Sequence, residues 1–247
     1  MGSMRRLSPG KAVYHALNTV WSFRQVAARI ALPWVPVLLL CGIAEVYVGP
    51  PDPMGEQISF AQLALFLVSL IATSSLAVSW HRFVLRDEPA AGLRLDGSVM
   101  RYAGYSLLFL FAFSILLLLV LGLAFSAPSA AGFGLPAAVL AGGIVTRLSI
   151  KLPAVALSNR AFTFRQAWAA SAGNFWPCVG VFLLNAAIVI GAFLALVLLG
   201  GGIGQINATL GDFVVALGSL LLQLVYAFLN ASILTSLYGY FVEHRDF

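Results

Sequence analysis

Two cations stand inside the fourth long apolar stretch of the sequence. Arg147 and Lys151 are four residues apart with Ser149 between them, so a helix would place both cations on one face. Charged side chains within a bilayer are costly and mark functional sites. With Arg160 and Arg165, the pair would form a cytoplasmic-leaflet pocket for an anionic lipid head group or substrate anion. The alternative is that Arg147 and Lys151 pair structurally or extend to the membrane surface.

Uncharged polar residues form a second pattern, in the last apolar stretch and the one before it. Ser219, Gln223, Tyr226 and Asn230 recur at steps of four, three and four, and Asn185 would face them. One interpretation is hydrogen bonding between packed helices; the other is a polar transport path. A continuous polar cavity reaching Gln223 and Asn230 would favour transport, whereas a tightly packed interior would argue against it.

Motifs for catalysis, metals and cofactors are missing from the sequence. It has no serine elbow, HExxH pair or CxxC pair, and its three histidines lack ligand spacing. The run Gly200–Gly204 lacks the lysine of a phosphate loop and predicts a flexible loop. An enzyme acting on lipid head groups would need acids near the cations, and Asp87, Glu88 and Asp96 are the candidates. We therefore expect no catalytic residue, no metal, no cofactor and no enzymatic activity.

The composition identifies the elements that must position these residues. Of 247 residues, 61% are hydrophobic and 9% are charged, whereas soluble domains have about 25% charged residues. This excludes a disordered or disulfide-rich chain and disfavours a soluble enzyme. We predict an all-α, polytopic membrane protein forming one domain over residues 1–247. Its six transmembrane helices are expected at about 30–48, 58–80, 102–125, 135–157, 175–199 and 213–242.

Amphipathic interfacial helices are predicted before three of these crossings. The first spans residues 8–29, with Ser8-Pro9 at its start and Pro33 and Pro36 turning the chain after it. Its polar face is expected to carry Lys11, His15, Asn18, Ser22, Gln25 and Arg29, and its apolar face Val13, Leu17, Val20, Trp21 and Ala28. A second short piece is expected at 93–101. A third covers 163–174, where Thr163 and Gln166 have capping-box spacing. The chain would then contain three helical hairpins, arising from a weak internal repeat or from interfacial anchoring alone.

The 14 basic residues define the predicted orientation. All lie in the N-terminal arm, the second-to-third connection, the fourth-to-fifth region or the C-terminal tail, and none lies in the opposite loops. Because positive charge favours the cytoplasmic side, both termini are predicted to be cytoplasmic. The formal net charge of +5 then indicates contact with anionic membrane lipids rather than nucleic acid.

Several motifs resemble a bacterial family. RLSIKLPA at 147–154, FRQAW at 164–168, GNFW at 173–176 and LYGYF at 237–241 are similar to segments of six-helix membrane proteins. These are the YciC-like proteins and the membrane domain preceding some glycerophosphodiester phosphodiesterases. WHRFVL at 80–85 is similar to alphaproteobacterial members. The resemblance implies a protein of the bacterial inner membrane, but the phosphodiesterase catalytic domain is absent, so no activity carries over.

The function expected from the sequence is non-catalytic. The protein would pack with a partner membrane protein or another copy of itself, organise anionic lipid at the cytoplasmic leaflet, or do both. The alternative is a transporter of a lipid or small amphiphilic molecule.

Overall fold

The computed structural model describes residues 6–49, 59–126 and 132–246, and these residues form ten helices and no strand. The all-α prediction is thus confirmed for the described residues. The helices are α1 Pro9–Ser22, α2 Arg24–Ala31, α3 Val35–Val48, α4 Phe60–Arg86, α5 Gly97–Ser126, α6 Gly134–Ser149, α7 Lys151–Ala156, α8 Phe164–Ala170, α9 Phe175–Gly204 and α10 Ala208–Phe241.

Five segments are long and apolar enough to cross a membrane: α4, α5, α6 with α7, α9 and α10. A sixth span requires α2 and α3 to act together, although a bend of 60° separates them. Pro33 and Pro36 lie at this bend, as predicted. Alone, α3 has 14 residues, which at 1.5 Å per residue fall short of a bilayer core about 30 Å thick. The described helices fit a multi-pass membrane protein with five or six spans.

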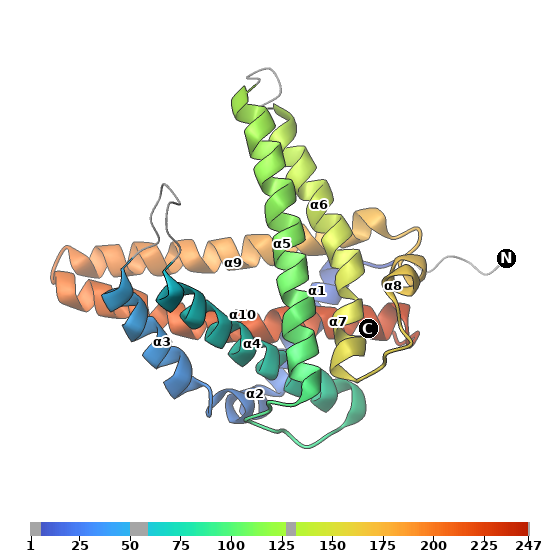
Figure 1. The fold of residues 1–247 in the computed structure, drawn as a ribbon, viewed down its shortest axis with the longest axis horizontal. Helices are drawn as coiled ribbons and strands as arrows, with labels where there is room; N and C mark the ends of the chain where they lie inside the picture. Colours follow the sequence, from blue (N-terminus) through green and yellow to red (C-terminus); the bar gives the residue numbers. More distant parts are fainter. Residues whose placement is uncertain (1–5, 50–58, 127–131, 247) are drawn as a thin grey trace.

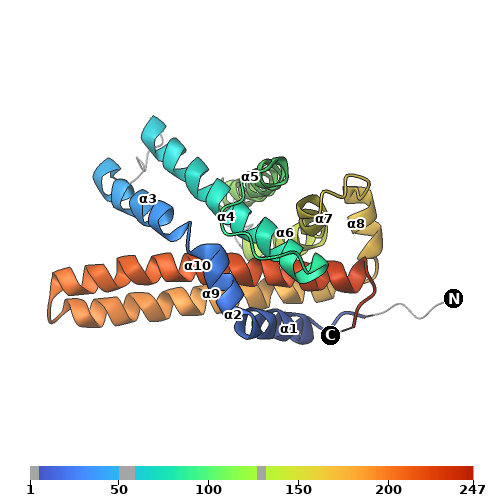
Figure 2. The same ribbon diagram turned by 90° about the horizontal axis from the view of Figure 1, so that it is seen from below.

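Three hairpins diverge from a common end of the molecule (Figures 1 and 2). They are α3–α4, α5–α6 and α9–α10, and the helices α1, α2, α7 and α8 gather where the hairpins meet. The largest fully buried side chains also come from this end, including Trp80, Ile30 and Leu237. All lysines and arginines of the described residues belong to segments of the common end. The described hairpin tip at 205–207 has none.

The predicted helix over 8–29 is divided into α1 and α2 by a break at Phe23. Its inward face also differs from the prediction. Ala12 and Ala16 are fully buried, because α1 packs against α9 and α10 through small residues. His15, predicted on the polar face, packs toward α10, with its Nδ1 atom 2.9 Å from the Ser236 hydroxyl oxygen. Burial lowers the pKa of His15.

The predicted short helix at 93–101 is absent before Gly97, because its backbone bonds to neighbouring elements instead. The Ser75 hydroxyl of α4 donates to the Arg94 carbonyl oxygen at 2.7 Å. The Asp96 carboxylate then accepts from the Ser98 and Val99 amides at 2.8 and 3.2 Å, and so caps the start of α5. In contrast, the Thr163–Gln166 capping box is confirmed and begins α8.

The predicted loop at Gly200–Gly204 is helical and completes α9. Its glycines allow α9 to contact α10 closely. A Cβ on Gly211 of α10 would lie 2.7 Å from the Gly200 carbonyl oxygen and 2.7 Å from the Gly204 Cα. In an apolar setting, small residues stabilise such a contact by letting two backbones approach. The loop prediction was wrong because it treated glycine as a breaker where glycine serves packing.

We predict that Gly211→Ala destabilises the α9–α10 hairpin, because the new methyl group would meet backbone atoms that cannot rotate away. Overpacking of this kind costs about 1–3 kcal/mol. A thermal unfolding assay in detergent should show a lower Tm. Gly201→Ala is the matched control, since nothing lies within 4 Å of its Cβ. Equal melting temperatures for both variants would contradict the close contact.

Candidate functional site

A pocket of about 380 Å³ lies between the hairpins α5–α6 and α9–α10. Its volume is within the range of about 300–1,000 Å³ that is typical of small-molecule sites. Four of the segments that are long and apolar enough to cross a membrane contribute to its wall. The lining residues are Ser106, Phe109, Leu110, Phe113, Val145, Thr146, Ser149, Leu152, Val181, Phe182, Asn185, Tyr226, Asn230, Ile233 and Leu234.

One wall of the pocket depends on a close contact between α6 and α9. A Cβ on Gly142 would lie 2.4 Å from the Phe182 ring, and one on Gly143 would lie 2.4 Å from Val179. The two glycines therefore let α9 press against α6, which holds the Phe182 ring at the pocket. On the α5 side, Phe113 packs against Phe182 with ring centroids 6.3 Å apart.

The polar side chains that line this pocket are all uncharged. Asn185 and Tyr226, from α9 and α10, hydrogen-bond each other. The Asn185 Oδ1 atom is nevertheless buried and has no hydrogen-bond partner. A buried, unpaired polar atom costs free energy that a suitable partner would recover. A residue in the wall of the pocket therefore carries a buried hydrogen-bond acceptor to which the described residues supply no donor.

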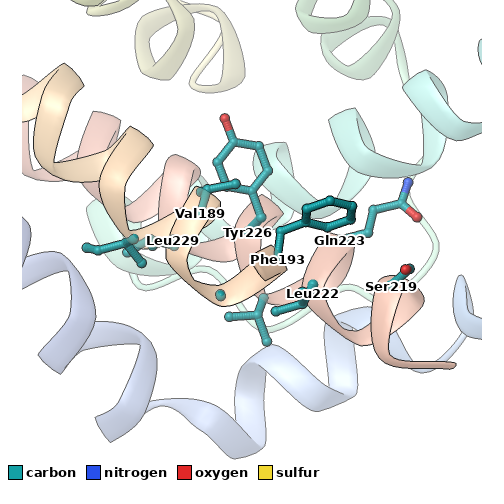
Figure 3. A pocket seen from close by; sticks show the side chains of 10 residues that line it. Val189, Phe193, Ser219, Leu222, Gln223, Tyr226 and Leu229 are labelled. Atoms are coloured by element: carbon teal, nitrogen blue, oxygen red, sulfur yellow. The ribbon is translucent and has the colours of Figure 1, made fainter. Parts of the chain in front are cut away.

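A second pocket of about 280 Å³ adjoins the first between α9 and α10 (Figure 3). Tyr226 lines both pockets. The second one is mainly apolar, with Ser219 and Gln223 as its other polar residues. Its lining residues are Ile188, Val189, Ala192, Phe193, Ser219, Leu222, Gln223, Val225, Tyr226 and Leu229.

The predicted polar stripe is thus divided between two neighbouring pockets. Asn185, Tyr226 and Asn230 line the larger one. Ser219 and Gln223 line only the smaller one, nearer the tip of the hairpin.

The cations Arg147 and Lys151 do not line either pocket. Arg147 is 6% exposed; its Nε donates to Ser171 Oγ at 2.9 Å and its Nη2 to the Trp168 carbonyl oxygen at 2.8 Å. The guanidinium also lies 3.6 Å from the Trp168 ring centroid. Lys151 is 5% exposed and donates to the Phe162 carbonyl oxygen. Both cations therefore tie α6 and α7 to the connection that carries α8.

The other two predicted anion ligands are on the surface. Arg160 lies on the connection after α7 and Arg165 lies on α8, and both are exposed. Within the described residues, no ion pair joins a carboxylate to Arg147 or Lys151. Anion binding by the four residues together stays a prediction.

Sequence reasoning missed a buried network around His81, which is fully buried. The Thr235 hydroxyl donates to the Ala231 carbonyl oxygen at 2.8 Å, so it must accept from His81 Nδ1–H, 2.7 Å away. In the neutral ring, Nε2 then accepts from the Tyr102 hydroxyl at 3.3 Å. The network joins α4, α5 and α10. No sequence signal reveals it, because its members are far apart in the chain.

We predict that His81→Leu destabilises the fold by about 1–3 kcal/mol, because it leaves the buried Tyr102 hydroxyl unpaired. The double variant His81→Leu/Tyr102→Phe should lose less than the sum of the two single variants, since it removes both polar partners. Unfolding of all four proteins in the same detergent measures this coupling. Strictly additive losses would contradict the hydrogen bond.

No family model, curated protein or solved structure matches this chain.

Proposed function

We propose that this chain is a non-catalytic membrane protein that binds a lipid or small amphiphilic molecule between α5–α6 and α9–α10, as a carrier would. The observation that supports this most is the pocket of about 380 Å³ with its unpaired Asn185 oxygen. Hydrocarbon offers that oxygen no partner. An amphiphile provides both a polar group for Asn185 and an apolar body for the remaining wall.

The divergence of the hairpins supports the same proposal. Away from their common end, α5–α6 and α9–α10 lie apart (Figure 1), so an amphiphile could enter sideways from the surrounding lipid. The lining residues include no carboxylate, imidazole or thiol, which favours binding over bond breaking. Transport of the bound molecule remains part of the proposal.

The membrane placement is also proposed. Basic side chains gather at the common end, which supports a cytoplasmic position for that end and for both termini. A bacterial inner-membrane location is supported by the resemblance of residues 147–176 to the YciC-like group.

We predict that filling the pocket removes a bound amphiphile. Protein purified in mild detergent should retain a stoichiometric amphiphile, detected by native mass spectrometry. Ser106→Phe should lose it, because the new ring occupies the pocket. Ser114→Phe is the matched control on α5, since Ser114 does not line the pocket. A wild-type protein that retains no amphiphile, or equal retention in both variants, would contradict the proposal.

A second proposed role is the organisation of anionic lipid at the common end. It is supported by exposed aromatic and basic side chains: Trp21 is 71% exposed, and the Arg24 guanidinium lies 5.2 Å from its ring centroid. Such pairs are common at membrane surfaces. Exposed apolar faces on the hairpins leave room for a partner protein or a second copy as well.

We predict that Arg160→Gln/Arg165→Gln reduces the amount of anionic lipid that co-purifies with the protein, because both side chains are exposed and their charge attracts lipid phosphate. Each basic residue near a charged surface contributes about 1 kcal/mol. Co-purifying lipid should contain less anionic species than in the wild type. Gln62→Leu/Gln205→Leu, at the opposite hairpin ends, is the control. Unchanged anionic lipid in the arginine variant would exclude this role for the two residues.

A further inference from the structure

We infer that the molecule bound in the larger pocket is an uncharged amphiphile with a free hydroxyl group, such as a long-chain alcohol or a diacylglycerol. This inference rests on the proposed function and names the ligand class of the same site.

The inference that the ligand is uncharged follows from the residues that line the pocket. Its polar residues are hydroxyls and carboxamides, and none of its lining residues is charged. The nearest cations in the sequence, Arg147 and Lys151, are turned to the Trp168 and Phe162 carbonyl oxygens. A phosphate or carboxylate placed here would lose its hydration without gaining a counter-charge, which is unfavourable. An uncharged head group avoids that cost.

The inference that the ligand carries a hydroxyl group follows from the unpaired Oδ1 atom of Asn185. Asn185 Oδ1 is an acceptor and requires a donor. An ester or ether oxygen cannot donate, but a hydroxyl can. A hydroxyl also accepts, so it would suit the Asn185 amide in either orientation. Asn230 lines the same pocket and supplies a second carboxamide within it.

The apolar part of the ligand has a place in the adjoining pocket. Tyr226 lines both pockets, and the smaller one is an open pocket lined mainly by aliphatic and aromatic side chains such as Phe193, Leu222 and Leu229. This pocket lies nearer the hairpin tip, because its α10 residues precede those of the larger pocket in the chain. The ligand would therefore lie along α10 with its hydroxyl toward the common end.

The test compares three photoreactive probes on the wild-type protein in nanodiscs. The probes are a diazirine-bearing hexadecanol, its methyl ether and its phosphate monoester. We expect the alcohol to label the pocket peptides about three- to tenfold more than either analogue, the range expected for one hydrogen bond within a membrane. Labelling by all probes should be lost in Ser106→Phe.

A variant isolates the hydrogen bond. Asn185→Leu should reduce labelling by the alcohol to the level of the ether and leave the ether unchanged. Asn18→Leu is the matched control, because Asn18 is exposed on α1. Equal labelling by the alcohol and the ether in the wild type would overturn the hydroxyl inference. If that equal labelling were then lost in Ser106→Phe, the proposal that the pocket binds an amphiphile would still hold. Stronger labelling by the phosphate would overturn the uncharged class. No pocket labelling by any probe would overturn both proposals.

Discussion

Polar groups buried among the helices of this chain must find partners within the chain, because neither packed apolar side chains nor hydrocarbon supplies any. This constraint explains much of the common end of the fold. His81 is bonded through both ring nitrogens, and Arg147 donates to Ser171 and Trp168. Each bond joins two different elements of the fold. The hydrogen bonds that satisfy these polar groups therefore also hold the helices of the common end together. The hairpins diverge where such bonds become fewer.

Glycine performs a complementary task along the hairpins. Where polar bonds are few, helices associate by close packing, and small residues permit it. Gly142 brings α6 onto Phe182 of α9, and Gly211 brings α10 onto the Gly200 turn of α9. The first contact fixes one wall of the larger pocket, while the second holds the far end of the hairpin together. Along α9, the larger pocket begins at the first contact, and the smaller pocket lies between the two contacts.

The sequence was sufficient for features that depend on local chemistry. The apolar stretches, the bend beside Pro33 and the Thr163–Gln166 capping box follow from residue type and short spacing. The face of α1 was predicted incorrectly, because His15 pairs with Ser236, which is 221 residues away. For the same reason, periodicity could place Asn185 opposite Tyr226 but could not show that Asn185 Oδ1 lacks a partner. Unpaired atoms are properties of the assembled helices, and no local pattern encodes them.

Charged and uncharged polar side chains occupy different parts of the fold because they find hydrogen-bond partners in different places. Arg147 and Lys151 lie beside the connection that carries α8, whose carbonyl groups are free to accept because the backbone there is not continuously helical. Within α9 and α10, each interior carbonyl group already accepts a helical hydrogen bond, so a cation would find only the second lone pair of such a group, as Thr235 does at Ala231. Carboxamides and hydroxyls cost less to bury than charges. A pocket formed between such helices is thus uncharged for structural reasons, and the same limit applies to any molecule that occupies it.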